Sequence, residues 1–249
     1  MDFISGEIIA VDKPLGWTSF DVVKRLRGAI QRRLGLSRFK VGHAGTLDPL
    51  ATGVLLVCTG RATRRIDELQ AGTKEYLATL RLGATTPCFD LETEVDATYP
   101  YEHVTEDLVR QALPRFRGDI MQVPPVYSAV KVDGRRAYKF ARKGREVELR
   151  PKPLRIDALE MTALDGDRLC LRVVCSKGTY IRALARDIGR ALGTGAHLVE
   201  LRRTRVGDHD SASCLSLDQA LRRIADCTLE FPDDYRLPES SPTPGRQNE

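Results

Sequence analysis

The sequence predicts a mixed α/β protein of the α+β class, with a mainly antiparallel central sheet flanked by helices. Two observations support this class. Short segments with strand-like patterns often follow one another directly, without the long crossover helix that parallel pairing requires. Segments with helical apolar spacing lie between some of these strands. A chain of 249 residues can form one large domain or two small ones with a full core.

The first sixty residues predict two strands around one amphipathic helix. The helix follows from apolar residues at helical spacing, a Thr-Ser pair that can cap its start and a glycine that ends it. A stretch rich in Gly, Pro and Asp comes next and predicts a loop. The expected elements are a strand at Glu7–Val11, a helix from Thr18 or Ser19 to Gly35, a loop over 37–53 and a strand at Val54–Cys58.

The remainder predicts strands and helices in alternation, with no internal repeat. Between Asp90 and Asp107 there are seven acidic residues and no Lys or Arg, so this stretch is expected to be a surface excursion. Ser216 and Gln219 form a capping-box pair before the last helix. The expected strands are Tyr76–Leu82, Val126–Val132, Leu154–Thr162 and Arg168–Ser176. The expected helices are 105–113, 137–143, 180–192 and 217–225.

Charge is divided unevenly along the chain. Residues 1–205 hold 35 Lys/Arg and 25 Asp/Glu, a net +10, whereas residues 206–249 hold 4 and 9, a net −5. A basic body suits a polyanion such as nucleic acid, although many basic proteins bind none. No apolar run approaches the roughly 20 residues that span a bilayer. The first residues do not resemble a signal peptide, so a cytoplasmic protein without membrane contact is expected.

The sequence lacks the common signatures of cofactor and metal sites. It contains no G-x-x-x-x-G-K-[ST], G-x-G-x-x-G, G-x-S-x-G or H-E-x-x-H motif. The six cysteines include no C-x-x-C pair and the four histidines are scattered, so we expect reduced thiols and no metal site. Chemistry is therefore expected from ordinary side chains, without a cofactor.

One stretch, Lys40–Leu55, has an unusual composition for a loop. It contains three glycines, an Asp48-Pro49 pair and His43 five residues before the aspartate. The glycines allow close backbone approach or positive φ, and the proline stiffens the segment. Taken alone, the pattern favours a structural turn, because Asp before Pro often starts one.

The run Gly42–Gly53 resembles the signature of the TruB pseudouridine synthases. Further blocks match in the order in which that family has them, and together they cover residues 7–206. These ordered matches are far more specific than one motif. The resemblance implies a pseudouridine synthase fold and a catalytic domain over 1–206. The matching blocks are Val11–Gly16 with Thr18-Ser19, Lys74–Tyr76, Pro124–Lys131, Ser176–Arg182, and Gly195–Leu198 with Leu201–Arg203.

The resemblance implies an isomerase that converts one uridine of tRNA, at position 55 in the T-loop, to pseudouridine. Asp48 is then the catalytic carboxylate, acting as nucleophile toward base or sugar or as base at the sugar. Tyr76 stacks on the target base and takes part in proton transfer at C5. Tyr180 and Leu201 belong to the nucleotide pocket, and His43 enters the RNA as the base flips out. Without the resemblance, these residues are explained as core or loop positions.

Arg182 adds an argument that does not depend on the family. It falls in the first turn of the expected helix 180–192, where a cation opposes the helix dipole. An exposed arginine tolerates that cost. The alternative, which the resemblance supports, is that Arg182 pairs with Asp48 and keeps it ionised and oriented. We therefore expect Arg182 to be the third catalytic residue, beside Asp48 and Tyr76.

The chain departs from the family pattern near its end. Many members carry a C-terminal RNA-binding domain of the PUA type. Here residues 207–236 are expected to form a short extension with one helix, and 237–249 a disordered tail. Recognition is then expected to concentrate on the T-stem-loop of tRNA, by a monomer without an obligate protein partner. Basic blocks at 135–145, 150–155 and 202–205 read as solvated faces, or as phosphate-binding surfaces if they line one groove, and Lys13 as a support for the site loops.

Three other functions are compatible with parts of the sequence. The first is an RNA-binding or tRNA-folding protein without catalysis, which would not require Asp48, Tyr76 and Arg182 together. The second is a pseudouridine synthase that acts on another RNA, such as ribosomal RNA. The third is a small-molecule lyase that uses Asp48, which leaves the basic faces unexplained.

Overall fold

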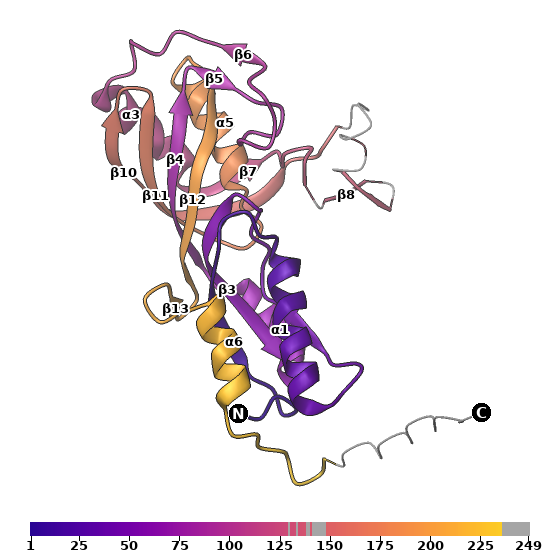
Figure 1. The fold of residues 1–249 in the computed structure, drawn as a ribbon. Helices are drawn as coiled ribbons and strands as arrows, with labels where there is room; N and C mark the ends of the chain where they lie inside the picture. Colours follow the sequence, from indigo (N-terminus) through magenta and orange to yellow (C-terminus); the bar gives the residue numbers. More distant parts are fainter. Residues whose placement is uncertain (129, 133, 138–139, 141–147, 236–249) are drawn as a thin grey trace, which may run out of the picture.

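The computed structural model describes residues 1–128, 130–132, 134–137, 140 and 148–235. Its main element is a sheet of ten strands, drawn in Figure 1. These strands are β1 (Ile8–Lys13), β2 (Val41–His43), β3 (Ala51–Thr59), β4 (Lys74–Leu82), β7 (Gly118–Gln122), β10 (Lys152–Asp165), β11 (Arg168–Cys175), β12 (Ala196–Val206), β13 (His209–Asp210) and β14 (Leu215–Ser216).

The strand order is β14-β1-β3-β12-β4-β11-β10-β7, with β2 added beside β3 and β13 beside β12. Among the strands described, two pairs run parallel, β1 with β14 and β3 with β12. The other pairs of the sheet are antiparallel. The predicted mainly antiparallel sheet flanked by helices is therefore confirmed.

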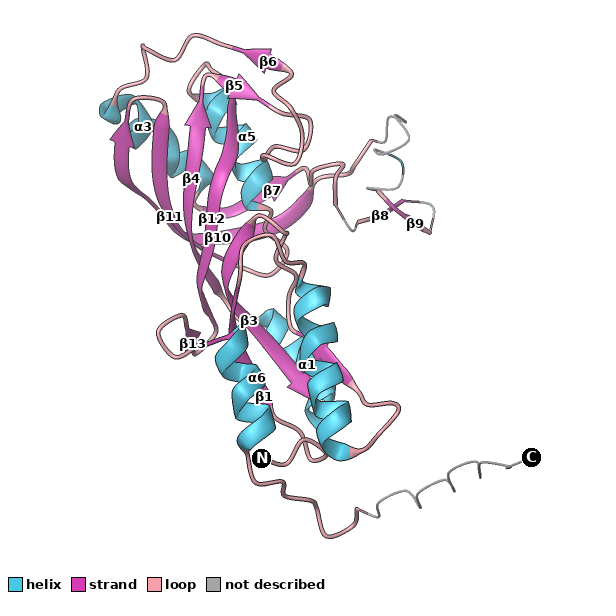
Figure 2. Cartoon of the chain, in the orientation of Figure 1, coloured by secondary structure: helices cyan, strands magenta, loops and turns pink. Residues whose placement is uncertain are grey.

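The helices form two groups along the twisted sheet (Figure 2). One group packs on β4, β10, β11 and β12, and the other packs on β1 and β3. The first group is α3 (Glu106–Ala112) with the 3-10 turn Leu113–Phe116, and α5 (Ile181–Ala191). The second is α1 (Ser19–Leu34) and α6 (Leu217–Asp226), while α2 (Ile66–Ala71) follows a 3-10 turn at Gly60–Arg65. Two small ladders complete the fold, β5 (Ala84–Thr85) with β6 (Ala97–Thr98) and β8 (Lys131–Val132) with β9 (Arg135–Arg136).

Two of the three apolar clusters in the described chain correspond to the two helix groups, and the third is a small cluster around Val54 and Leu56. The larger core contains Leu80, Ile156 and Leu184, each at most 1% exposed. The second contains Val11, Leu26 and Leu55, which are fully buried between α1, α6 and the sheet. Strands β3, β12 and β4 are neighbours in the middle of the sheet, so the two cores share one continuous framework.

Local sequence signals placed several elements correctly. Thr18 caps α1 in a capping box with Asp21, and Gly35 ends it in the left-handed conformation. Ser216 and Gln219 form the expected capping box of α6. Along β4 every second residue is buried, because one face of the strand packs on the core as its alternation predicted. The helix expected over 137–143, apart from Ala137 and Phe140, and the tail over 237–249 lie outside the described residues.

Three expectations about secondary structure were wrong. The loop predicted over 37–53 contains β2 and the start of β3. Of the strand predicted over 126–132, only the last two residues form β8, and β7 lies upstream instead. Strand β12 was not predicted, although it is central. Its arginines do not form one solvated face, because Arg203 is 1% exposed.

The acidic stretch 90–107 is also less exposed than expected. Most of it lies on the surface, including Glu94 and Glu102. Asp90, however, is only 4% exposed. A buried carboxylate requires hydrogen bonds or a cation nearby, so its contacts belong with the functional site. No helix within the described ranges combines the length and the apolar character needed to cross a bilayer.

Gly53 of β3 pairs with Arg203 of β12, where the sheet passes from one helix group to the other. It has φ +101°, and a Cβ there would lie 2.1 Å from the carbonyl oxygen of Arg203 on β12. We expect Gly53→Ala to lower the free energy of unfolding by more than about 4 kcal/mol, because neither backbone can move aside. Urea unfolding measures this change. Gly166→Ala, at φ +55° with no atom within 4 Å, is the control and should cost only about 1–2 kcal/mol. Equal losses would contradict this account.

Candidate active site

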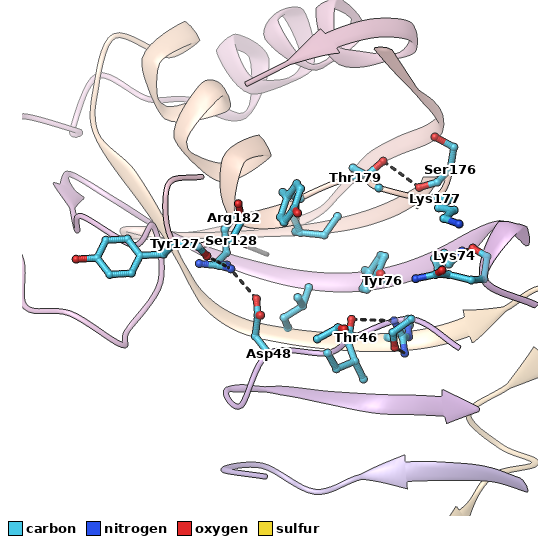
Figure 3. A pocket seen from close by; sticks show the side chains of 18 of the residues that line it. Thr46, Asp48, Lys74, Tyr76, Tyr127, Ser128, Ser176, Lys177, Thr179 and Arg182 are labelled. Atoms are coloured by element: carbon cyan, nitrogen blue, oxygen red, sulfur yellow. Dashed lines mark hydrogen bonds and ion pairs between the residues drawn. The ribbon is translucent and has the colours of Figure 1, made fainter. Parts of the chain in front are cut away.

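A cavity of about 510 Å³ opens where the two halves of the sheet meet (Figure 3). Its walls come from segments far apart in the sequence, including the loop between β2 and β3, strands β4 and β12, and the start of α5. A volume of this size is typical of a site for a small molecule or a single nucleotide. The predicted site residues Asp48, Tyr76, Tyr180, Arg182 and Leu201 all line it.

The central contact of the cavity is an ion pair between Asp48 and Arg182. The Nε atom of Arg182 lies 3.0 Å from Oδ2 of Asp48. The arginine side chain is 7% exposed, whereas the aspartate side chain is 38% exposed and open to the cavity. The pair expected from the sequence is therefore present, with its cation buried and its carboxylate accessible.

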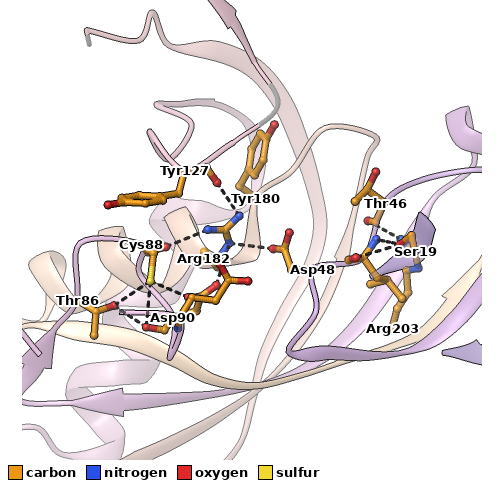
Figure 4. A network of polar contacts seen from close by, with 12 residues as sticks. Ser19, Thr46, Asp48, Thr86, Cys88, Asp90, Tyr127, Tyr180, Arg182 and Arg203 are labelled. Atoms are coloured by element: carbon orange, nitrogen blue, oxygen red, sulfur yellow. Dashed lines mark hydrogen bonds and ion pairs between the residues drawn. The ribbon is translucent and has the colours of Figure 1, made fainter. Parts of the chain in front are cut away.

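The remaining contacts of Arg182 fix its orientation (Figure 4). Nη1 donates to the carbonyl of Cys88 at 3.1 Å, and Nη2 donates to the carbonyl of Tyr127 at 3.0 Å. Asp90 adds a second carboxylate, with Oδ2 3.5 Å from Nε. The guanidinium thus contacts two carboxylates and two carbonyls, and its planar fork cannot turn without breaking them.

The loop that carries Asp48 is held from three sides. Ser19, at the start of α1, accepts a hydrogen bond from the backbone N–H of Leu47 at 2.8 Å and donates one to its carbonyl at 3.0 Å. The buried Lys13 donates to the carbonyls of Trp17 and Pro49. Burial lowers the pKa of Lys13 to about 8. Lys13 is therefore a support of the loop, as the sequence suggested.

Arg203 of β12 provides the third support. Its Nη2 donates to the carbonyl of Gly45 at 3.1 Å, Nη1 to that of Thr46 at 3.4 Å, and Nε to that of Val54 at 2.8 Å. These bonds join both ends of the aspartate loop to the strand beside it. Hydrogen bonds from the side chains of Ser19, Lys13 and Arg203 to the backbone of this loop thus fix the position of Asp48.

Tyr76 lies on β4 and is 8% exposed, with its ring at the cavity. Burial raises the pKa of its phenol, and the guanidinium of Arg203 only partly opposes this effect. The hydroxyl therefore stays protonated at neutral pH. Two residues earlier, Lys74 donates to the carbonyls of Gln70 and Gly72, and burial lowers its pKa to about 8.

Tyr180 and Leu201 both line the cavity, from different elements. Tyr180 is the residue before α5, and Gln122 holds its backbone, accepting from its N–H at 2.9 Å and donating to its carbonyl at 3.2 Å. Leu201 is half-buried on β12 beside Ala51 of β3. Burial raises the pKa of the Tyr180 phenol.

His43 is the one predicted site residue that does not line the cavity. It ends β2 and pairs with Val57 of β3, at the base of the loop that carries Asp48. Burial lowers the pKa of its imidazole, so the ring is neutral at pH 7. The structure thus brings five of the six predicted residues to one cavity and leaves His43 nearby on the same segment.

Several residues of the site were not anticipated from the sequence. Asp90 was hidden in an acidic stretch, and nothing in its neighbours distinguishes a buried carboxylate from an exposed one. Arg203 lies in a basic run, and Gln122 has no local signature. Each acts through a contact with a distant segment, as in the bonds from Gln122 to Tyr180 and from Arg203 to Gly45.

Arg182→Lys tests whether the fork itself matters. A lysine keeps the charge but cannot contact Asp48 and both carbonyls in one plane. We expect kcat to fall by about 10²–10³-fold, the usual cost of losing a preorganised charge partner. Single-turnover kinetics measure this change. Arg110→Lys, an exposed residue paired with Glu106 on α3, is the control and should keep full activity. A kcat near that of the wild type in Arg182→Lys would show that the planar geometry of the guanidinium is not required.

Two family models match the chain in succession. Residues 31–181 match the TruB family pseudouridylate synthase N-terminal domain, and residues 182–230 match the tRNA pseudouridylate synthase B C-terminal domain. Among curated relatives, the tRNA pseudouridine synthase B of Parabacteroides distasonis is 62% identical over 219 residues, which are 88% of this chain and 93% of that protein. The Mycobacterium leprae protein of the same name is 48% identical and covers 90% of this chain and 73% of its own length.

Solved structures give the same result for the fold. A chain of the Cbf5-Nop10-Gar1 complex is 33% identical, with a TM-score of 0.65 over 89% of this protein. A chain of the archaeal box H/ACA Nop10-Cbf5 complex is 32% identical, with a TM-score of 0.61 over 87%. This protein spans 53% to 55% of the length of those two chains. With a family model over most of its length and close relatives over nearly all of it, this chain belongs to the TruB family of pseudouridine synthases.

Proposed function

We propose that this chain isomerises uridine to pseudouridine at position 55 in the T-loop of tRNA. The observation that carries the proposal is the Asp48–Arg182 pair, which presents an oriented carboxylate to a nucleotide-sized cavity. Family membership supports the same reaction. The enzyme is then an isomerase that cleaves the glycosidic C–N bond, turns the base and forms a C–C bond to C5 of the same uracil.

Asp48 is the proposed catalytic carboxylate. Arg182 holds one oxygen of Asp48, whose side chain is 38% exposed and lines the cavity. An ionised carboxylate in this position can attack the base or the sugar, or remove a proton from the sugar. All three routes are redox-neutral, since the product has the same atoms as the substrate. We propose Arg182 and Tyr76 as its catalytic partners.

The proposed reaction requires the target nucleotide to leave the RNA stack. A stacked base hides both faces, and the carboxylate at the cavity wall cannot reach its sugar or ring. Tyr76 and Tyr180 offer aromatic surfaces to the flipped nucleotide, and Leu201 adds an apolar wall. His43, with its neutral imidazole at the base of the loop, is proposed to enter the RNA where the base left.

We propose residues 1–206 as the catalytic domain and 207–236 as a short extension rather than a full PUA module. In the described part of that extension, β14 pairs with β1 and α6 packs on the second core. The extension therefore adds to the sheet instead of forming a separate core. The proposed partner is the T-stem-loop of tRNA, bound by a monomer that needs no second protein.

Asp48→Asn tests the reaction and the role of the carboxylate together. Purified protein and variant are each incubated with an unmodified tRNA transcript, and pseudouridine is mapped at every uridine. We expect pseudouridine at the single T-loop position with the wild type and a rate more than about 10³-fold lower with the variant, which keeps size but loses charge. If both bind RNA and neither makes pseudouridine, an RNA-folding function replaces the catalytic one. Product in another RNA, such as ribosomal RNA, would correct the substrate.

Tyr76→Phe separates stacking from proton transfer. The ring and its packing survive this change, while the protonated hydroxyl is lost. We expect kcat to fall by about 10²-fold with KM unchanged, because general acid–base groups contribute on this scale. Steady-state kinetics on the tRNA transcript give both constants. An unchanged kcat would restrict Tyr76 to stacking, and Tyr180→Phe tests the wall residue in the same assay.

A further inference from the structure

The exposed face of α1 borders a hollow whose lining is strongly basic. The hollow has a volume of about 690 Å³ and runs along the outer side of the helix. It contains four cationic side chains and one carboxylate, that of Asp21. Asp21 already accepts two hydrogen bonds from Thr18 in the capping box. The four cationic side chains are those of Lys24, Arg25, Arg27 and Arg32.

Three of these cations lack both an ion-pair partner and an aromatic partner in the described part of the chain. No carboxylate oxygen there lies within 4.0 Å of the charged nitrogens of Lys24, Arg25 or Arg32. Arg27 lies over the ring of Phe20, at 5.8 Å from its centroid. Some arginines elsewhere on the surface are paired, for example Arg81 and Arg168 with carboxylates at 2.9 Å and 3.2 Å, whereas others such as Arg64 and Arg115 have no ion pair in the described part of the chain. The face therefore carries uncompensated positive charge.

The helix dipole explains only one of the three unpaired cations. Arg32 lies in the last turn of α1, where a cation interacts favourably with the dipole. Lys24 and Arg25 lie in the middle of the helix, beyond the reach of either end, since the effect falls off within one turn. Lys24 still interacts by charge with Asp21, three residues before it, whereas the position of Arg25 along the hollow has no such explanation within the helix.

Gly28 occupies the centre of this face. Glycine weakens a helix interior relative to alanine, and it is usually kept where a backbone or ligand approaches closely. A Cβ at Gly28 would meet a single atom, Nη1 of Arg32 at 3.6 Å, which is an ordinary contact. No contact among the described residues therefore requires a glycine there. The absence of a side chain keeps the floor of the hollow open to something from outside.

The hollow adjoins the active site through the start of α1. Gly16 and Trp17 line it, and the N–H of Gly16 donates to the carbonyl of Pro49, which lines the catalytic cavity. Lys13 donates to the carbonyls of both Trp17 and Pro49. The loop that holds Asp48 and the start of the basic face are thus one connected unit. From there, α1 extends over about 24 Å at 1.5 Å per residue.

We propose that this face of α1 binds phosphate groups of the tRNA backbone, with Gly28 leaving room for a phosphate between Lys24, Arg25 and Arg32. The inference rests on the proposed function, because it extends the surface that holds that substrate. Phosphate contacts position an RNA without reading its sequence. Trp17 and Phe20, which are 36% and 59% exposed, supply aromatic surface at the end nearest the cavity.

A triple variant tests the charges. Lys24→Gln, Arg25→Gln and Arg32→Gln together should weaken tRNA binding by on the order of 10-fold or more at moderate salt, since each lost phosphate contact removes counterion release. The slope of log K against log salt should fall by about 2–3. Filter binding over a salt series measures both. The control removes three paired arginines far from the cavity, through Arg81→Gln, Arg110→Gln and Arg168→Gln.

A loss in the α1 variant that exceeds the loss in the control, with kcat at saturating tRNA unchanged, supports the proposal. Equal salt slopes in the wild type and the α1 variant overturn it. The proposed function fails separately, by absence of pseudouridine with the wild type, because the binding assay needs no turnover. The two failures are therefore distinguishable.

Gly28→Ala provides a second test that unfolding cannot explain. Alanine favours the helix and meets no close neighbour, so the melting temperature should stay the same or rise. If a phosphate lies against Gly28, the methyl group should raise KM for tRNA several-fold while kcat is kept. An unchanged KM, together with a melting temperature no lower than that of the wild type, shows that the glycine has no such contact and contradicts this placement of the phosphate.

Discussion

A buried guanidinium needs several partners at once, and the partners of Arg182 come from three separate parts of the chain. Asp48 lies before β3, Cys88 and Asp90 lie after β5, and Tyr127 lies after β7. Removing any one of them leaves charge or donors uncompensated in a region with little water. Arg182 therefore connects the segments of the site, because three loops must be in place before its charge and its N–H donors all have partners.

The same requirement explains why the aspartate loop is so firmly held. Lys13 and Arg203 are both buried, and their charged groups donate to backbone carbonyls rather than to carboxylates. Such burial destabilises the charged form, as the lowered pKa of Lys13 shows. Stability lost in this way is acceptable where a reacting group must stay within a fraction of an ångström of its position. The loop is thus organised before any substrate arrives.

Sequence reasoning succeeded where local rules decide the structure and failed where distant contacts do. The caps at Thr18 and Ser216 and the alternation along β4 are local, and they were predicted. The β12 strand was missed because polar and charged residues interrupt its apolar pattern. In the fold it pairs with β3 on one side and β4 on the other. Nothing in the sequence distinguishes Asp90 and Arg203 from exposed aspartates and arginines. Only the fold distinguishes them, whereas Asp48 was found through the family motif.

The sheet is continuous beneath the cavity, and this limits how far the protein can change shape when it binds its proposed substrate. Strand β12 pairs with β4 along nearly its whole length and with β3 in its second half, so one hydrogen-bonded strand underlies both halves of the molecule. A hinge between the halves would have to break that ladder. In the proposed complex with tRNA, most of the distortion then falls on the RNA. RNA loops whose bases unstack at a low free-energy cost are then favoured as substrates. Substrate selection depends on how easily the RNA deforms as well as on its sequence.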